Sequence, residues 1–288
     1  MEKQLKLAIQ KKGRLSDKSL QLLRNCGLDI ENFQERLIIS ATNFNLDILF
    51  LRDDDIPEYV QDNVAHIGMV GENVVLEKGL DVEVVKHLGF GRCTLSLGIP
   101  ENEEIQGIDD IREKTIATSY PNILKNYLSD NNINAKVIDI SGSVEIAPSL
   151  GVADLICDLV STGNTLKLNK LKKSFNILNS QAVLIKSKKL DEDPELKILF
   201  DKLMGRIDSS LKARKSKYIM MNIPKESLDR IIEIIPSLKS PTVLPLSDEN
   251  LLAVHAVINE DKFWEINEDL KEAGASGILS LPIENIIL

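Results

Sequence analysis

Short apolar runs alternate with helical patterns over the first hundred residues of the chain. Residues 5–9 are mostly apolar and typical of a short buried strand, and a helical pattern over residues 17–25 follows and is closed by Gly27. Further elements are predicted beyond it, namely a helix at residues 56–61 and strands at residues 37–39, 48–51 and 66–70. The alternation predicts an α/β fold with ligand-binding loops at the ends of the strands.

A second α/β series begins near Cys93. Its predicted helices are at residues 121–130 and 144–150, and its predicted strands are at residues 115–117, 136–140, 155–159, 172–178 and 182–185. The last of these strands is a candidate to return to the first series. Residues 186–193 are charged and without a period, which predicts a loop, and residues 194–217 predict a long helix.

The third segment starts at Tyr218 and has the order β-α-β-β-α-β. Its strands are predicted at residues 218–222, 242–246, 252–257 and 277–281, and its helices at residues 225–235 and 263–273. This order is typical of a ferredoxin-like half-sandwich. A compact tail separate from the other two series suggests a regulatory or assembly module.

Composition and charge narrow the classes of function. Hydrophobic residues make up 43% of the 288 residues, which is ordinary for a globular protein, and the length suggests two or three domains. The formal net charge of -9 argues against a nucleic-acid binder or a membrane-surface protein, because either needs a basic face. We expect a cytoplasmic protein, since residues 1–13 lack the apolar run of a signal peptide and no segment is long enough to span a bilayer. The three cysteines and three histidines do not have the spacing of a metal site.

The segment from Asp158 to Leu166 is the strongest candidate for chemistry, because it follows an apolar strand and opens a helix. A helix N-terminus presents unpaired N–H groups and a partial positive charge, and both favour a phosphate. Gly163 lets the backbone approach an anion, and nearby hydroxyls are further donors. The carboxylate of Asp158 can accept hydrogen bonds from vicinal ribose hydroxyls. The alternative is an ordinary capped helix, since Ser and Thr are common caps.

A signature of known spacing surrounds this segment. Its members are Glu145, Gly151, Ala153, Ile156, Asp158, Leu159, Thr162, Gly163, Thr165 and Leu166. Other matching stretches occur in order along the chain, at residues 10–16, 52–57, 71–73, 117–121 and 217–221. Together they resemble the long form of ATP phosphoribosyltransferase, which performs the first step of histidine biosynthesis. The resemblance covers nearly the whole chain, and a departure at Lys170, where relatives often have glycine, lies beyond the phosphate loop.

The resemblance implies a fold and a division into domains. Two periplasmic-binding-protein-like α/β domains would surround a cleft, and a C-terminal ferredoxin-like (ACT-like) βαββαβ domain would follow. Catalytic domain I would comprise residues 1–94 with 182–214, and catalytic domain II, which carries the phosphate loop, would comprise residues 95–181. Residues 215–288 would form the regulatory, histidine-binding domain.

The resemblance also implies the reaction. Adenine N1 of ATP would attack C1 of phosphoribosyl pyrophosphate and expel pyrophosphate. The attack needs no strong general base, because adenine N1 is already unprotonated at neutral pH. Mg²⁺ would act mainly through the substrates, with positioning and charge carrying the catalysis.

Site residues follow from the same resemblance, each weighed against a plain structural role. Asp154 and Asp158 are the candidate catalytic carboxylates. The phosphoribosyl pyrophosphate would also contact Ser161, Thr162, Gly163, Asn164 and Thr165. ATP or pyrophosphate would contact Lys11, Arg14, Arg52 and Glu72. Lys11 and Arg14 could instead be solvated surface cations, and Glu72 is similarly ambiguous.

Regulation and assembly are further expectations. Histidine would inhibit the enzyme from a site in the tail, with Asn222, Leu238, Thr242, Ala275 and Ser276 as candidate contacts. The chain would form a homo-hexamer in equilibrium with dimers. Two other readings are a binding protein of the same fold without chemistry, and a weak catalyst that needs a partner subunit. The carboxylate beside the phosphate loop argues against the first of these, and the intact signature and the tail argue against the second.

Overall fold

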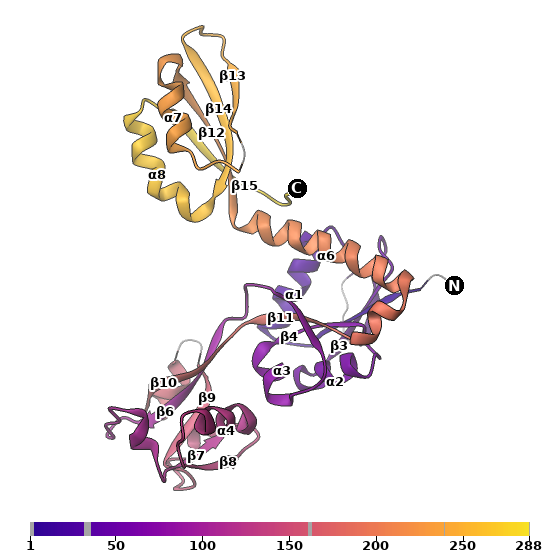
Figure 1. Cartoon of the computed structure of the whole chain (residues 1–288), viewed down its shortest axis with the longest axis vertical. Helices are drawn as coiled ribbons and strands as arrows, with labels where there is room; N and C mark the ends of the chain where they lie inside the picture. Colours follow the sequence, from indigo (N-terminus) through magenta and orange to yellow (C-terminus); the bar gives the residue numbers. More distant parts are fainter. Residues whose placement is uncertain (1–2, 32–35, 161–162, 239, 288) are drawn as a thin grey trace. The chain divides into compact units, whose positions relative to one another are not determined.

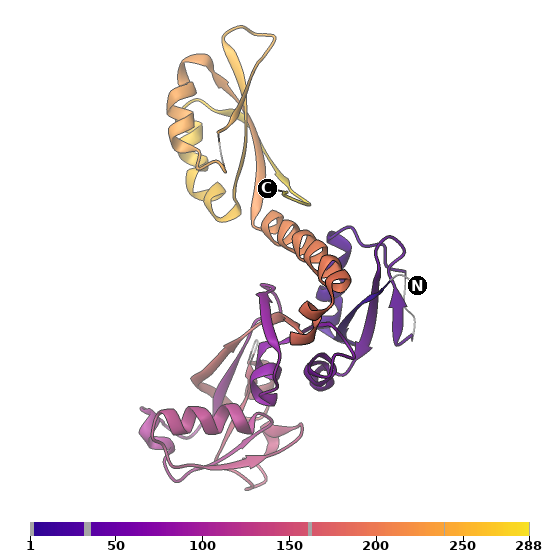
Figure 2. The same ribbon diagram turned by 45° about the vertical axis from the view of Figure 1, so that its right-hand side comes forward.

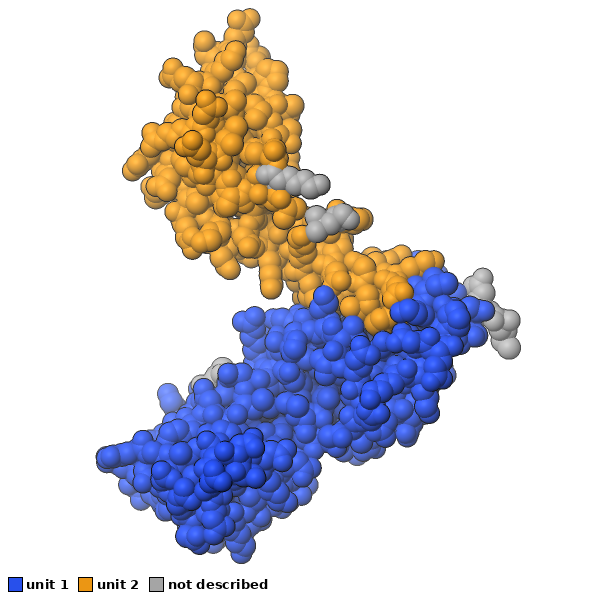
Figure 3. All heavy atoms as spheres, viewed as in Figure 1, with its two compact units in different colours: residues 1–21, 29–199 blue, residues 22–28, 200–288 orange. Residues whose placement is uncertain are grey.

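The computed structural model describes residues 3–31, 36–160, 163–238 and 240–287. It divides into two compact units, coloured separately in Figure 3. Unit 1 contains residues 1–21 and 29–199, and unit 2 contains residues 22–28 and 200–288. Helices α1 (Arg14–Asn25) and α6 (Pro194–Arg214) contribute residues to both units.

The first half of unit 1 is built on a six-stranded sheet, sheet A, with the order β2-β3-β1-β4-β11-β5. Its central strand β1 pairs in parallel with β3 and β4, whereas β2, β5 and β11 pair antiparallel with their neighbours. The strands are β1 (Leu5–Gln10), β2 (Ile38–Ser40), β3 (Leu46–Leu51), β4 (Ile67–Gly71), β5 (Glu83–His87) and β11 (Ala182–Lys186). The continuous apolar runs in the central strands are those expected of a sheet with both faces covered.

Short helices follow the parallel strands of sheet A. The turn η1 (Asp53–Asp55) and helix α2 (Ile56–Gln61) follow β3, and α3 (Glu72–Lys78) follows β4. Apolar side chains of α2 and α3 join those of the sheet in one buried cluster that includes Ile56, Val60 and Val74. The turn η4 (Lys188–Glu192) follows β11 and leads to α6. This half of unit 1 is called lobe I below.

Residues 93–180 form lobe II around a five-stranded sheet, sheet B, with the order β10-β6-β9-β7-β8. Strand β7 is parallel to β8 and β9, and β6 is antiparallel to both β9 and β10. Its strands are β6 (Cys93–Pro100), β7 (Thr115–Thr118), β8 (Lys136–Asp139), β9 (Leu155–Val160) and β10 (Leu171–Ser180). Its helices and turns are η2 (Ile108–Ile111), α4 (Pro121–Asp130), η3 (Val144–Ile146) and α5 (Asn164–Leu168).

Sheet B is covered on both faces. Leu155 and Cys157 of β9 belong to the core cluster on the α4 side, and the alternate residues Ile156 and Val160 belong to the cluster that Leu166 of α5 completes. This is the two-residue alternation of a strand between two helical layers. Lobes I and II are joined through two neighbouring strands, because the chain enters lobe II by β6 and leaves it by β10, which pairs Ser180 with Cys93. Figure 1 shows these two strands side by side as they approach lobe I.

Unit 2 contains a four-stranded antiparallel sheet, sheet C, with the order β13-β14-β12-β15. Its elements are β12 (Ser216–Pro224), η5 (Lys225–Ser227), α7 (Leu228–Ile234), β13 (Thr242–Pro245), β14 (Leu251–Asn259), α8 (Glu260–Glu272) and β15 (Ser276–Pro282). Both helices cover one face of the sheet, as Figures 1 and 2 show. That face carries a buried core of aliphatic side chains that includes Ile219, Met221 and Val254.

The predicted α/β class is confirmed, and so is the return of the strand at residues 182–185 to the first sheet, where β11 pairs with β4. The tail has the predicted order of elements. The helix predicted over residues 144–150 is wrong, because only the single turn η3 (Val144–Ile146) forms there. Three elements, α3, β5 and β6, are missing from the sequence-based prediction. The first two are short, β5 is an exposed strand of sheet A that lacks an apolar run, and polar residues and Gly98 interrupt the apolar residues of β6.

Gly98 in β6 lies where the space is too small for the Cβ atom of alanine. A Cβ atom there would lie 2.7 Å from Cγ1 of Ile156 and 3.2 Å from Cδ2 of Leu166, inside the packed core of lobe II. We expect Gly98→Ala to lower the free energy of unfolding by about 1–3 kcal/mol, the usual cost of overpacking.

Gly205 in α6 has no atom within 4 Å of the added Cβ. Gly205→Ala should therefore stabilise the protein by roughly 0.5–1 kcal/mol through the lower chain entropy of the unfolded state. Thermal unfolding of both variants checks the pair, and equal shifts of the same sign would contradict the expectation.

Candidate functional site

The carboxyl ends of the parallel strands of lobe I meet at one edge of sheet A, as parallel pairing requires. Lys11 follows β1, Arg52 follows β3, and Glu72 follows β4. The Lys11 N–H donates to the backbone oxygen of Leu51 at 2.8 Å, which keeps two of these ends adjacent. The residues of lobe I that are predicted to contact ATP or pyrophosphate therefore lie at the same edge of the sheet.

Three cations lie along this edge. Lys11 and Arg52 are exposed, and Arg14 is an exposed residue that opens α1. Among the described residues, no carboxylate forms a salt bridge with any of the three. Their charges are consequently available to an anionic ligand.

Glu72 is engaged by a residue that the sequence did not single out. Its Oε1 lies 3.0 Å from Nε2 of His87, which is on the neighbouring strand β5. The backbone N–H of Glu72 donates to Gln181 O at 2.9 Å. Glu72 is thus held against β5 and against the segment that re-enters lobe I, and any contact with a substrate would have to accommodate His87.

Lobe II presents a similar edge, formed where β7 and β9 end. Asp158 is half-buried near the end of β9, and its Oδ1 accepts a hydrogen bond from the Leu159 N–H at 2.7 Å. Burial raises the pKa of the Asp158 carboxyl, and the nearby charge of Glu145 in η3 adds to the effect. Loss of solvent disfavours the charged form of this carboxyl. A positive charge that develops beside it would stabilise the charged form.

Asp154 does not share this environment. It precedes β9 at the opposite end of the strand from the phosphate loop, where it is exposed and its Oδ2 accepts a hydrogen bond from the Thr115 N–H at 2.7 Å. Four residues of extended chain separate it from Asp158, roughly 13 Å at 3.3 Å per residue. The expectation that Asp154 and Asp158 act in one site therefore does not agree with the geometry. Asp154 instead fastens the start of β7 to the start of β9.

Part of the phosphate loop is described. Ser161 and Thr162 lie outside the described residues. Gly163 has a φ of 75°, in the left-handed region, and precedes α5. Asn164 and Thr165 are exposed in the first turn of α5, and this helix has only five residues. Because the helix is so short, hydrogen-bond donors of the loop must count for more than the helix dipole in any binding of phosphate here.

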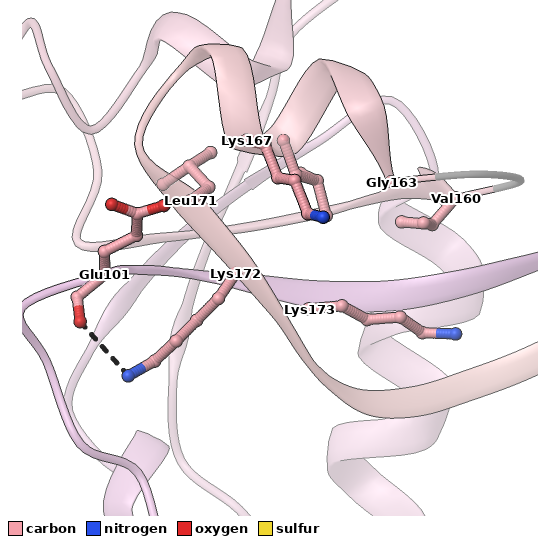
Figure 4. Close-up of a pocket in the computed structure, with 8 residues that line it drawn as sticks. Glu101, Val160, Gly163, Lys167, Leu171, Lys172 and Lys173 are labelled. Carbon is pink, nitrogen blue, oxygen red and sulfur yellow. Dashed lines mark hydrogen bonds between the residues drawn. The ribbon is translucent and has the colours of Figure 1, made fainter.

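A cavity of about 410 Å³ lies beside the loop, between α5 and β10. Three of its lining residues are lysines, Lys167, Lys172 and Lys173, which Figure 4 shows. The rest of the lining is mainly apolar. Lys172 donates to the backbone oxygen of Glu101 at 3.2 Å, and its side chain points away from that of Lys173. Since the ammonium groups do not converge, the cavity is not a formed anion site.

Residues facing the cleft from both lobes include several that were not singled out as site residues. Asn73 of α3 donates from Nδ2 to the hydroxyl of Tyr120 at 3.3 Å, and it accepts a hydrogen bond from Ser180 Oγ at 2.9 Å. Burial raises the pKa of Tyr120, as do the charges of Asp158 and Asp53, so the phenol stays protonated. Tyr120 lies within a stretch that resembles the family, so inspection of that motif could have named it, whereas Asn73 is as ambiguous in the sequence as Glu72.

Asp53 is the most strongly perturbed carboxyl near the cleft. Burial, followed by the charge of Asp54, raises the pKa of Asp53 to about 6. Among the described residues nothing hydrogen-bonds to its buried Oδ1 atom. A buried acceptor without a donor is costly, and a ligand that supplies a donor or a cation would remove that cost.

A cavity of about 620 Å³ lies between the two lobes. Polar groups dominate its lining, and three of them are carboxylates, those of Asp54, Glu77 and Asp139. Tyr120 and Ser119 also line it, from the turn between β7 and α4. The cleft is thus acidic, apart from Lys78, and an anionic substrate would enter it more easily with a divalent cation attached.

The tail residues expected to bind histidine fall into two groups. Asn222 pairs with Ser276 across β12 and β15, and the Ser276 hydroxyl donates to Asn222 O at 3.3 Å, beside the buried Ala275. Thr242 is in β13 at the other edge of the sheet, and Leu238 is bound near it through its N–H to Val257 O at 3.0 Å. Strand β14 lies between β13 and β12, and the register places Thr242 in line with Met220 rather than with Asn222, so the two groups do not form one cluster within a single chain.

Within the described ranges, no group of three or more His, Cys, Asp and Glu side chains is placed to hold a metal ion. No described helix is long and apolar enough to cross a membrane. A Mg²⁺ ion carried by the substrates stays a prediction.

Comparison with known proteins shows similarity over the whole chain. Residues 52–209 match the family model described as ATP phosphoribosyltransferase, and residues 213–285 match the model described as the HisG C-terminal domain. The ATP phosphoribosyltransferase of Cytophaga hutchinsonii is 49% identical over 283 residues, which is 98% of each chain. That of Parabacteroides distasonis is 46% identical over 284 residues, 99% of this chain and all of the relative.

A solved structure is also similar. It is the ATP phosphoribosyl transferase (HisG:HisZ) complex from Thermotoga maritima, with 30% identity and a TM-score of 0.59 over 71% of this chain and 98% of that one. The first family model alone matches more than half of the residues, and the relatives extend through the tail. The chain therefore belongs to the ATP phosphoribosyltransferase family.

Proposed function

We propose that the protein transfers the phosphoribosyl group of phosphoribosyl pyrophosphate to N1 of ATP, giving phosphoribosyl-ATP and pyrophosphate in the first step of histidine biosynthesis. The observation that carries the proposal is the half-buried Asp158 at the end of β9, directly before the loop that leads to Gly163. Family membership supports the same reaction. Pyrophosphate release from purified protein with both substrates tests it, and the absence of release would contradict it.

The donor binds along the edge of lobe II. The loop of Ser161, Thr162, Gly163, Asn164 and Thr165 holds the 5-phosphate, and Asp158 accepts hydrogen bonds from the ribose hydroxyls. As the bond from C1 to the pyrophosphate oxygen breaks, positive charge grows on the ribose ring. The Asp158 carboxylate stabilises that charge, and because the group is half-buried the interaction is weakly screened. The N1 lone pair of adenine forms the new bond to C1, and the electron pair of the broken bond leaves with pyrophosphate.

ATP and the leaving pyrophosphate take the edge of lobe I. Lys11, Arg14 and Arg52 contact phosphate oxygens, and the absence of competing salt bridges among the described residues supports this role. Mg²⁺ carried by the substrates would offset the repulsion between their phosphates and the acidic lining of the cleft. Glu72 lies beside these cations and orients His87 as well as the entering nucleotide.

The domain division follows the three sheets. Residues 1–94 with 182–214 form catalytic domain I, residues 95–181 form catalytic domain II, and residues 215–288 form the ACT-like regulatory domain. Sheets A, B and C lie in these three ranges in turn, apart from the first residues of β6. We place the protein in the cytoplasm, where its two substrates are made.

The tail senses histidine in an assembled protein. Because β14 lies between the two groups of candidate contacts, a histidine that touches both would sit where two copies meet and each copy supplies one group. A homo-hexamer in equilibrium with dimers provides such contacts. Histidine shifts activity by binding one arrangement of the subunits better than another.

Gly163→Val should raise the Michaelis constant for phosphoribosyl pyrophosphate at least tenfold. The φ of Gly163 is in the left-handed region, and a branched side chain there would displace the loop that holds the phosphate. Gly27→Val is the matched control, since Gly27 has a φ of 72° but lies at the end of α1, away from the loop. Steady-state kinetics with varied donor give the comparison, and a folded Gly163→Val protein with an unchanged constant would remove the loop from the site.

Asp158→Asn should lower kcat on the order of 100-fold, the usual size for the loss of one electrostatic contact to a transition state. Its stability at neutral pH should be equal or higher, because the wild-type carboxyl has a raised pKa and its charged form is disfavoured in the folded state. Melting temperature and turnover are measured on the same sample. Wild-type turnover would exclude the proposed role of Asp158.

Removal of the residues after Lys217 should abolish both inhibition by histidine and the hexamer. The cut removes all but the first two residues of β12 and the rest of sheet C, and with it both groups of candidate contacts. Light scattering and inhibition curves test the two effects. Ser276→Ala in the full chain is the finer control, expected to weaken inhibition while the hexamer persists. Full inhibition of a hexameric truncated protein would place the regulatory site elsewhere.

A further inference from the structure

Glu77 connects the two lobes of unit 1 in a way that the reaction does not explain. It lies on α3 of lobe I, and its carboxylate accepts hydrogen bonds from two backbone N–H groups of α4 in lobe II. Asn122 N–H donates to Oε1 at 2.9 Å, and Ile123 N–H donates to Oε2 at 3.0 Å. The side-chain amide of Asn122 also donates to the backbone oxygen of Glu77 at 2.9 Å.

Helix α4 has no cap from its own lobe. Its N-cap residue, Tyr120, makes no capping hydrogen bond through its side chain, and Pro121 at the first helical position has no N–H. The next two N–H groups both face Glu77. A carboxylate at this end also interacts favourably with the helix dipole. The start of α4 is therefore completed by lobe I, and only while the lobes are together.

A second contact joins the same two elements. Asn73 in the first turn of α3 donates to the hydroxyl of Tyr120, the residue that precedes α4. The Asn73 N–H and Oδ1 are both bonded to the hydroxyl of Ser180, at 3.0 and 2.9 Å, at the end of β10. Asn73 thus fixes α3 to the connection between the lobes, and Glu77, one turn farther along, contacts the lobe that would move.

We propose that Glu77 is a positioning residue that holds the two lobes in the closed arrangement in which the substrates react. Apart from the two strands of the connection, Glu77 provides the strongest set of described hydrogen bonds between the lobes. Loss of its carboxylate lowers the fraction of closed protein, and the apparent affinity for a ligand that needs both lobes falls by the same fraction. The effect on kinetics rests on the proposed function, since it requires substrates that contact both lobes in the closed protein.

The test compares Glu77→Ala with a carboxylate that caps inside one lobe. Asp110 accepts hydrogen bonds from the N–H groups of Gln106 and Gly107 at 2.8 and 2.9 Å, all within lobe II. Asp110→Ala therefore serves as a control for the loss of a cap without the loss of a contact between lobes. Glu77→Gln keeps the shape and the acceptor oxygen, and it should recover part of the wild-type behaviour.

Kinetics of the full-length protein give the first readout. We expect Glu77→Ala to raise the Michaelis constants for both substrates about three- to tenfold, because water takes over most of what the lost hydrogen bonds contributed to closure, with a smaller change in kcat. Asp110→Ala should leave both constants within twofold of wild type. Unchanged or lowered constants in a folded Glu77→Ala protein would overturn the proposal, as would an equal rise in the control.

A second readout needs no activity. In the substrate-free protein, Glu77→Ala should increase amide hydrogen exchange at Asn122 and Ile123 and also widen the distribution of sizes seen by small-angle scattering. A purely local cap would change the exchange alone, and that result would overturn the proposal. If wild-type protein releases no pyrophosphate, the proposed function fails while the scattering comparison still decides whether Glu77 holds the lobes together.

Discussion

The antiparallel pairing of β6 with β10 is the constraint on which the candidate site depends. The chain passes from sheet A to sheet B through β6 and returns through β10. Cys93, the first residue of β6, pairs with Ser180, the last residue of β10. Two adjacent strands resist twisting far better than one, yet they still allow bending at their ends. This connection lets the carboxyl ends of β1, β3 and β4 on one lobe work with those of β7 and β9 on the other.

Charge in the cleft follows one pattern. Carboxylates of both lobes are partly buried, and Asp53 and Asp158 have raised pKa values chiefly through loss of solvent. The cations Lys11, Arg14 and Arg52 are exposed at the edge of sheet A where its parallel strands end. Such an arrangement suits a reaction in which the reacting ring becomes positive while the phosphates stay negative, because each charge meets the opposite sign. An adenine nitrogen is already unprotonated at neutral pH, so its attack does not need a general base in the cleft.

The described hydrogen bonds between the lobes come from a short element. Glu77 and Asn73 are on α3, a helix of seven residues; Asn73 bonds to Tyr120, and Glu77 bonds to the first turn of α4. Hydrogen bonds of this kind exchange readily with water, whereas the cores on either side of each sheet do not. A protein with rigid lobes and a polar contact between them can open and close without loss of its folded cores.

The sequence by itself determined the class of fold, the order of most elements and the family, and it predicts the phosphate loop. Apolar runs mark many of the buried strands, and a motif of fixed spacing is legible without coordinates. The sequence did not yield α3 and β5, which are short, or β6, whose apolar residues are interrupted, and the resemblance grouped Asp154 with Asp158. Only the tertiary structure bonds Asp154 to the start of β7, sets His87 against Glu72, and brings Glu77 to the start of α4. Each of these depends on which strands and helices become neighbours, and neighbours are chosen by packing over long separations that local residue patterns do not encode.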